Sequence, residues 1–337
     1  MTTKGSGFDT LLAVYTGSSV SGLTLIASDD NSGQCNTSQL TFTPSSGTIY
    51  RIAVDGRNGA QGTVKLTLQS DSSAQPASLQ FTLNTVQRPA GQFMVTVTGR
   101  ASASVTLDVS SDLETWTPGY ATFTLSGTGS FAYTDTAATP STRFYRASIA
   151  ASPAQQSCNI VGYVGRTMPT GQSMHCNPLN AVDNRVSALL AGVPDGTTVY
   201  KFNDATQTFI TDGFDFGAWS DPNLTFVPGE GFIIQPGAAW SHSFVGEVAQ
   251  GYGVNPVPNL QSIRSSIVPQ GGRVVTDLKL PVLNGDTVTR MINGSYTTYT
   301  FSGGAWSPSE PVASIGESFW NNKNVGFNWN RNFLVFP

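Results

Sequence analysis

The sequence predicts an all-β fold of tandem small β-sandwich or barrel domains with one short helical insertion. Apolar and polar residues alternate along most of the chain, and the alternating runs end in Gly, Asn, Asp or Ser, as strands that end in turns do. Charged residues make up only 11% of the 337 residues, and Ser, Thr, Asn and Gly take their place. This composition is typical of secreted β-proteins.

Three runs show the period of two that a half-buried strand requires. Their apolar faces consist of Tyr50, Ile52 and Val54 in YRIAVDG, Val64, Leu66 and Leu68 in TVKLTLQ, and Phe93, Val95 and Val97 in GQFMVTVTG. We expect a strand at each of the three runs.

One stretch, NAVDNRVSALLAG, has helical spacing instead. Val182, Val186, Leu189 and Leu190 fall at i, i+4, i+7 and i+8, and Gly192 follows as a C-cap. We therefore expect one short helix here.

Breaks rich in small polar residues or proline divide the chain. They are SDSSAQPAS at 70–78, IAASPAQQSC from 149 and GYGVNPVPN from 251. The predicted units are 1–70, 76–150, 157–250 and 257–337, and each is large enough for a small β-domain.

The last two units share a frame of tryptophan and glutamate. Trp219 stands eleven positions before Glu230 in GAWSDPNLTFVPGEGF, and Trp306 stands eleven before Glu317 in GAWSPSEPVASIGESF. Other matches follow the same order, so the frame indicates a duplicated domain. Two copies are too few for a solenoid, and we interpret them as a tandem pair.

Two further matches set the register between the copies. MPTG at Met168 pairs with VPQG at Val268, an offset of 100, and GTTVYKF at Gly196 pairs with GDTVTRM at Gly285, an offset of 89. This register makes the later copy eleven residues shorter, in the stretch that holds the predicted helix of the earlier copy.

Three cysteines permit at most one intramolecular disulfide, and Cys158 with Cys176 is the nearest pair in the sequence. The odd thiol would then be a buried Cys35 or a bond to another chain. His175 and His242 are the only histidines, and no CxxC occurs, so the sequence does not predict a transition-metal site.

Trp219 and Trp306 have two interpretations. Exposed indoles would stack on sugar rings, which makes both residues candidates for carbohydrate binding. Alternatively, the indoles cover the end of each β core, and Glu230 and Glu317 accept backbone N–H groups at a glycine turn. The two glutamates occupy equivalent positions in separate domains, so they do not predict a shared catalytic cleft.

The loop ASDDNSG places Asp29, Asp30 and Asn31 together between two strands. Their oxygens could bind Ca²⁺, and no other cofactor is predicted. The alternative is an Asx-turn, in which the side chain accepts backbone N–H groups of the loop.

The net charge of -4 gives no basic stripe for nucleic acid, and no apolar run approaches the length of a membrane span. Neither nucleic acid nor membrane insertion is therefore expected.

The first unit resembles the pre-peptidase C-terminal (PPC) β-sandwich of bacterial secreted proteins, through GSGFDTLLAVYTG, LIASDDNSG and GTIYRIAVDGRNGAQGTVKLTL. In that family a strand precedes the GSGFDT motif, so the resemblance implies that this unit lacks its first strands. The second unit resembles fibronectin-like modules of the same surface proteins, through SDLETW and RFYRA. The last two units resemble a domain of no assigned activity from the C-terminal side of such chains.

These resemblances imply a non-enzymatic extracellular protein of the bacterial cell surface with a structural or adhesive role. Its partners would be copies of itself or other surface proteins, joined into filaments through exposed strand edges. The alternative is an array of carbohydrate-binding modules from a larger secreted enzyme.

Overall fold

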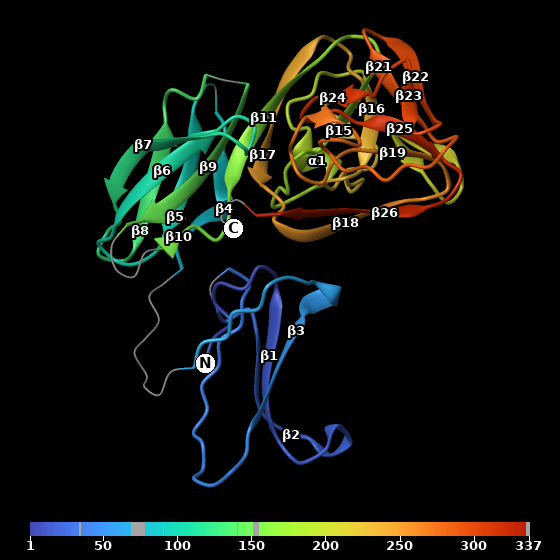
Figure 1. The fold of residues 1–337 in the computed structure, drawn as a ribbon. Helices are drawn as coiled ribbons and strands as arrows, with labels where there is room; N and C mark the ends of the chain where they lie inside the picture. Colours follow the sequence, from blue (N-terminus) through green and yellow to red (C-terminus); the bar gives the residue numbers. More distant parts are fainter. Residues whose placement is uncertain (34, 69–77, 90, 140, 151–154, 335–337) are drawn as a thin grey trace.

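The computed structural model describes residues 1–337 except 34, 69–77, 90, 140, 151–154 and 335–337 (Figure 1). The described chain is built from antiparallel strands, and its one α-helix is α1 (Val186–Leu189). The predicted all-β class with one short helical insertion is confirmed. Most of the predicted break at 70–78 and part of the break from 149 lie outside the described residues.

The N-terminal sheet stands apart from the other sheets in Figure 1. Its strands, in the order β2-β1-β3, are β1 (Thr10–Thr16), β2 (Thr24–Asp30) and β3 (Arg51–Gly56). The core against β1 is small, because its fully packed members are only Leu12, Val14 and Leu40. Both outer strands therefore leave apolar side chains in solvent.

The three predicted strands have different outcomes. YRIAVDG forms β3, and GQFMVTVTG forms β5 (Phe93–Thr98), whose three predicted core residues are at most 3% exposed. TVKLTLQ was wrongly predicted, since its described part holds only an isolated bridge between Thr67 and Thr2. It runs beside the N-terminal segment, where Gly5 has a φ of 87° and breaks a regular ladder.

The second unit is a sandwich of two sheets. Its smaller sheet has the order β4-β5-β8, and its larger one has the order β17-β11-β9-β6-β7, with β10 added to β9. The strands besides β5 are β4 (Gln80–Gln87), β6 (Ser104–Ser110), β7 (Trp116–Thr124), β8 (Ser130–Asp135), β9 (Thr142–Ile149), β10 (Gln155–Gln156), β11 (Val161–Met168) and β17 (Trp240–Glu247).

Strand pairing crosses the predicted boundary between the second and third units. Val161 of β11 pairs with Tyr145 of β9, and Val161 and Tyr163 belong to the same core as Phe93. The second unit and the first copy of the duplicated domain therefore share a sheet.

The duplicated domains have the same topology. Each has a five-stranded sheet, in the order β12-β16-β13-β14-β15 in the first copy and β19-β25-β21-β22-β23 in the second. Each also has a ribbon of its first and last long strands, β11 with β17 and β18 with β26.

The sheet strands of the first copy are β12 (Ser173–Cys176), β13 (Thr197–Asn203), β14 (Thr208–Asp215), β15 (Ala218–Trp219) and β16 (Gly231–Gln235). The second copy contains β18 (Gly251–Val257), β19 (Leu260–Arg264), β20 (Gly272–Arg273), β21 (Thr287–Ile292), β22 (Ser295–Ser302), β23 (Ala305–Ser307), β24 (Val312–Ala313), β25 (Phe319–Lys323) and β26 (Phe327–Phe333).

The structure corrects the predicted register between the copies. MPTGQSMHC from Met168 is equivalent to VPNLQSIRS from Val257, because both sequences end a ribbon strand and then form the first strand of the five-stranded sheet. The match of MPTG to VPQG is wrong, since VPQG follows β19 instead of preceding it. Equivalent residues of the two copies therefore differ by 89 in number from Met168 and Val257 onward. The predicted eleven-residue difference in length does not exist.

The offset changes by two at one hairpin. The first copy joins β13 to β14 through residues 204–207, whereas the second joins β21 to β22 through Asn293 and Gly294 alone. The second turn has positive φ at both residues, as the two-residue Asn-Gly hairpin requires. The copies therefore differ in length where the first carries a longer loop.

The helix is shorter than predicted. Val186 and Leu189 lie in α1 and Leu190 follows it, all three buried, but Val182 precedes the helix and is 65% exposed. The second copy turns at the same place, where the N–H of Lys279 donates to the carbonyl of Val275 at 3.1 Å. The helical turn is therefore not an insertion confined to one copy.

A small apolar core joins the two copies and follows their symmetry. Met174, Phe202 and Ile233 come from the first copy, and Ile263, Met291 and Trp320 occupy the equivalent positions in the second. β12 lies against β21, and β19 lies against β13. The two copies thus pack as an internal pseudo-dimer.

Ile263→Ala should lower the free energy of unfolding by about 2–5 kcal/mol, because it opens a cavity in this shared core. The matched control is Ile210→Ala, at a residue that is 43% exposed, with an expected change below about 1 kcal/mol. Urea denaturation measures both variants. Equal losses would contradict the shared core.

Candidate functional site at the seam of the two copies

The Trp–Glu frame shared by the two copies contains two equivalent turns, each closed by its glutamate. The Glu230 Oε2 atom accepts the backbone N–H of Val227 at 3.1 Å, and the Glu317 Oε2 atom accepts that of Ser314 at 3.0 Å. Each carboxylate therefore closes a turn three residues before it, as the second interpretation of the frame predicts.

Each glutamate also has a cation partner within its own copy. Lys201 Nζ lies 2.9 Å from Glu230 Oε2, and Arg290 donates to both oxygens of Glu317 at 2.7 and 2.9 Å. The Glu230 side chain is 32% exposed and that of Glu317 is 8% exposed. Both carboxylates are therefore held in ion pairs that stabilise the fold, and the Glu317 carboxylate is almost completely buried.

The two turns hold the copies together by a reciprocal exchange. The N–H of Cys176, at the end of β12, donates to the carbonyl of Gly316 at 3.1 Å. The N–H of Ser265, just past β19, donates to the carbonyl of Gly229 at 3.0 Å. Both glycines have positive φ, 98° at Gly229 and 79° at Gly316, which turns their carbonyls toward the other copy.

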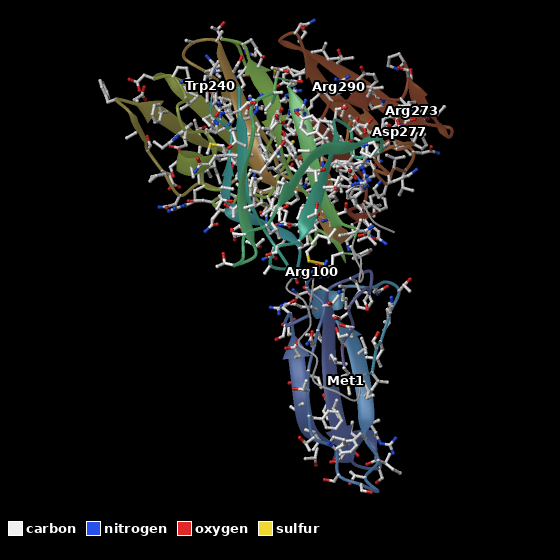
Figure 2. The ribbon with its side chains drawn as sticks, turned by 90° about the vertical axis from the view of Figure 1, so that its left-hand side faces the viewer. Met1, Arg100, Trp240, Arg273, Asp277 and Arg290 are labelled. Carbon is white, nitrogen blue, oxygen red and sulfur yellow. A yellow bond between two sulfur atoms is a disulfide. The ribbon has the colours of Figure 1, made fainter. Side chains whose placement is uncertain are left out.

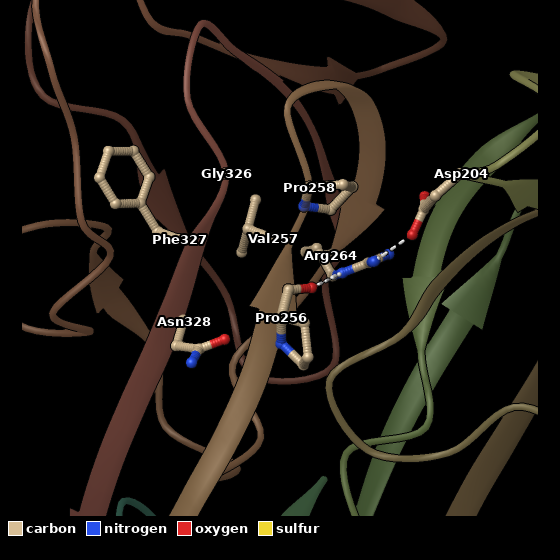
Figure 3. Close-up of a pocket in the computed structure, with 8 residues that line it drawn as sticks. All are labelled: Asp204, Pro256, Val257, Pro258, Arg264, Gly326, Phe327 and Asn328. Carbon is tan, nitrogen blue, oxygen red and sulfur yellow. Dashed lines mark hydrogen bonds and ion pairs between the residues drawn. The ribbon is translucent and has the colours of Figure 1, made fainter.

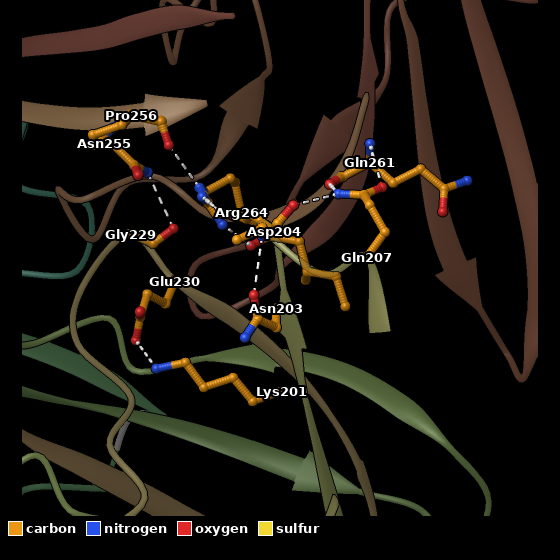
Figure 4. A network of polar contacts seen from close by, with 12 residues as sticks. Lys201, Asn203, Asp204, Gln207, Gly229, Glu230, Asn255, Pro256, Gln261 and Arg264 are labelled. Atoms are coloured by element: carbon orange, nitrogen blue, oxygen red, sulfur yellow. Dashed lines mark hydrogen bonds and ion pairs between the residues drawn. The ribbon is translucent and has the colours of Figure 1, made fainter. Parts of the chain in front are cut away.

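The ribbons support the same turns from the other copy. Arg166 of β11 donates to the carbonyl of Ile315 at 3.1 Å, and Asn255 of β18 donates to that of Gly229 at 3.1 Å (Figure 4). Each glutamate turn is thus bound by two elements of its partner copy, and we call this region the seam.

The longer loop of the first copy breaks the symmetry of the seam. In this loop Asp204 forms an ion pair with Arg264 of the second copy. Gln207 Nε2 donates to the carbonyl of Gln261 at 3.0 Å, and its Oε1 accepts the N–H of the same residue at 3.2 Å (Figure 4). The four-residue loop of the first copy therefore makes a contact that has no symmetric counterpart at the two-residue turn of the second.

A depression of about 380 Å³ opens beside this contact (Figure 3). It is lined by Asp204, Pro256, Val257, Pro258, Arg264, Gly326, Phe327 and Asn328. Asp204 and Arg264 neutralise each other, so the remaining lining is dominated by proline, valine and phenylalanine. Such a surface suits an apolar group better than a charged ligand.

The structure packs both tryptophans of the frame inward. Trp219 is 8% exposed and meets Phe214 at 5.3 Å between ring centroids, while Trp306 is half-buried and meets Phe301 at the same distance. The other tryptophans are also buried or half-buried, namely Trp116, Trp240, Trp320 and Trp329. The Trp219 indole therefore covers the core of the first copy, as the second interpretation predicts, whereas the Trp306 indole keeps part of its surface exposed.

The candidate calcium loop uses its side chains within the protein. Asp29 Oδ2 accepts the N–H groups of Ser32 at 2.9 Å and Gln39 at 2.8 Å, which is the Asx-turn alternative. Asp30 forms an ion pair with Arg57, and Asn31 has a φ of 82° at the turn. Among the described residues, no group of three or more His, Cys, Asp or Glu side chains could hold a metal ion.

The disulfide does not join the pair of cysteines that is nearest in the sequence. Cys35 is bonded to Cys158, and Cys176 is the buried free thiol. Cys176 lies in the seam, where its thiol donates to the Glu317 carbonyl at 3.8 Å, as the Ser265 hydroxyl does in the other turn. Figure 2 shows the disulfide in yellow where the N-terminal sheet meets the rest of the molecule.

No protein-family model and no curated protein sequence matches the chain. None of the helices in the described ranges is long and apolar enough to cross a membrane.

Sequence reasoning found the glutamate turns but missed the depression. The signal for it was the loop length, since ING in the second copy is a two-residue hairpin and NDATQ in the first is longer. Its contact partner lies more than fifty residues away, so no local pattern predicts the contact.

Glu317→Gln should lower the free energy of unfolding by about 3 kcal/mol, because it leaves the Arg290 charge largely buried without its partner. Glu230→Gln is the matched control at the equivalent turn. We expect a loss of about 1 kcal/mol there, since this pair is more exposed. Denaturant titration of both variants gives the comparison, and a larger effect at Glu230 would contradict the assignment.

The unfolding free energy should fall as the pH drops from about 6.5 to about 4, the window set by two buried histidines. Burial, with a smaller effect from the Arg166 charge, lowers the pKa of His175 to about 3, and burial lowers the pKa of His242 to about 4. The unfolded chain binds protons near pH 6.5 that the folded chain refuses, so acid favours unfolding, by up to about 1.4 kcal/mol per pH unit for each histidine.

The measurement is the unfolding free energy between pH 7.5 and 5, by urea titration at each pH. His175→Gln and His242→Gln should each reduce the slope by about half near pH 6. Slopes unchanged in both variants would show that other groups cause the acid sensitivity.

Proposed function

We propose that the chain is a non-enzymatic structural or adhesive protein of the bacterial cell surface, whose copies assemble through the edges of the N-terminal sheet. One observation carries the proposal. β2 and β3 form the two edges of a three-stranded sheet, and in the described part of the chain neither pairs with a further strand on its outer side.

The exposed apolar side chains of this sheet support the proposal. Leu25 and Ile26 of β2 are 53% and 44% exposed, and Ile52 of β3 is 38% exposed. Ile52 lies opposite Val14, which is fully buried, so the apolar face continues past the edge of the small core. An added strand would satisfy the edge backbone groups and cover this surface.

Charge favours pairing of the β2 edge of one molecule with the β3 edge of another. β2 carries Asp29 and Asp30, whereas β3 carries Arg51 together with Asp55. Two β2 strands paired in parallel and in register would bring four carboxylates together, and like charges across a strand pair are destabilising. Pairing of β2 with β3 of the next molecule is heterologous, and such contacts extend into filaments when the rotation between molecules does not close a ring.

The disulfide supports an extracellular location. The bond between Cys35 and Cys158 forms and persists in oxidising compartments, and it joins the N-terminal sheet to the start of the first copy. The low charge content agrees with a secreted protein. The carbohydrate-binding alternative has less support, because Trp219 is buried and Trp306 is half-buried against Phe301.

The test is the assembly of the intact chain, measured by sedimentation velocity over a range of concentrations and by electron microscopy. We expect oligomers that grow with concentration. Ile26→Lys combined with Ile52→Lys should weaken association at least about tenfold, because lysine on an edge opposes strand addition. Both side chains are exposed, so circular dichroism should show an unchanged fold.

Leu283→Lys is the control, at a residue that is 46% exposed in the second copy of the duplicated domain. It should assemble like the wild type. A chain that sediments as a monomer at every concentration, or a lysine pair that assembles normally, would refute the edge contact.

A further inference from the structure

Phe216 is the most exposed large apolar side chain of the described residues, at 99%. It stands at the tip of the hairpin between β14 and β15, where Asp215 pairs with Ala218. Its φ is 54°, in the left-handed region that favours glycine. A phenylalanine here is both strained and almost fully hydrated, and at 99% exposure no described residue packs over its ring.

The second copy shows that the fold does not need this side chain. The equivalent turn, between β22 and β23, consists of Gly303 and Gly304, with φ values of 61° and 82°. Phe216 and Gly217 have nearly the same backbone, with φ values of 54° and 79°. Glycine therefore supports the same hairpin, and phenylalanine in the first copy requires a reason outside the folded chain.

The chain also carries a surface that could receive an apolar tip, namely the depression at the seam. Pro256, Pro258 and Phe327 line it. The exposed side chains of Leu260, at the start of β19, and of Val325, between β25 and β26, are close to it in the sequence. Its volume of about 380 Å³ exceeds that of one aromatic side chain.

The tip and the depression cannot meet within one molecule. Asp204, which lines the depression, precedes β14, and Phe216 follows its other end. Eight residues of extended strand separate the two sites by roughly 24 Å. A contact between them must join two separate molecules, and it is heterologous because the two surfaces differ.

We propose that Phe216 of one molecule inserts into the depression between Pro256, Pro258 and Phe327 of a second molecule of the same protein. This inference rests on the proposed self-assembly and names a second contact in it. The tip is flanked by the exposed carboxylates of Asp195 and Asp215, whereas Arg264 in the depression is already paired with Asp204. The contact therefore depends on the burial of apolar surface.

Buried area identifies the role of this contact. One phenylalanine buries about 150–250 Å², whereas a stable interface buries about 1,200–2,000 Å² in total. The Phe216 tip alone therefore cannot hold an isolated pair of molecules together. It suits a repeated array, in which it adds to the pairing of strand edges and the two weak contacts reinforce each other.

The experiment places the photo-crosslinking residue benzoylphenylalanine at position 216 of the full-length chain. After irradiation of the assembled protein, peptide mass spectrometry should find crosslinks to residues 256–264 or 326–328 of another molecule. The matched control carries the same residue at position 303, on the equivalent turn, and should not give this product. Phe216→Gly should keep or raise the thermal midpoint and weaken association at least about tenfold.

The outcomes separate the inference from the proposed function. Crosslinks to another region, or Phe216→Gly with wild-type association, would overturn the inference and leave edge assembly standing. A wild-type chain that remains monomeric at every concentration would overturn both. Phe216→Leu, which keeps an apolar tip, should retain most of the association, and equal losses in the glycine and leucine variants would also count against the contact.

Discussion

The architecture of the C-terminal half depends on two backbone hydrogen bonds that cross the seam in opposite directions. Each copy presents a glycine carbonyl at its glutamate turn, and the chain at the end of the other copy's first sheet strand supplies the N–H. Buried backbone groups require partners, so neither copy satisfies its own turn alone. This reciprocity explains why the Trp-Glu frame occurs twice. The glutamate fixes the turn, the turn aims the carbonyl, and the partner copy completes it.

The features that the sequence predicted well are those decided within a few residues. Phe93, Val95 and Val97 alternate because a sheet has two faces, and Glu230 and Glu317 follow glycine because their turns need positive φ. Features that depend on a distant partner were predicted poorly. TVKLTLQ has strand periodicity, yet it lies beside an irregular glycine-containing segment and forms no regular ladder.

The register between the copies shows a second limit. MPTG and VPQG share two letters, but equivalence is set by strand pairing, which places Met174 opposite Ile233 and Ile263 opposite Trp320. The same applies to the depression and the disulfide. The depression arises where one copy has a longer hairpin than the other, and its walls come from both copies. The disulfide joins cysteines 123 positions apart, so sequence proximity gave no guide to the pairing.

The Cys35–Cys158 bond has a mechanical consequence for a protein that works under tension. Every residue from 36 to 157 lies inside the covalent loop that this bond closes. The loop contains β3 of the N-terminal sheet and strands β4 to β10 of the sandwich. If force pulls the N-terminal sheet away from the duplicated domains, the load passes through the sulfur atoms and bypasses that loop. The strands inside the loop would then be shielded from the load, whereas β11 and β17, which complete the larger sheet of the sandwich, would bear it. The extension of the chain under force would be shorter by the contour length of the loop.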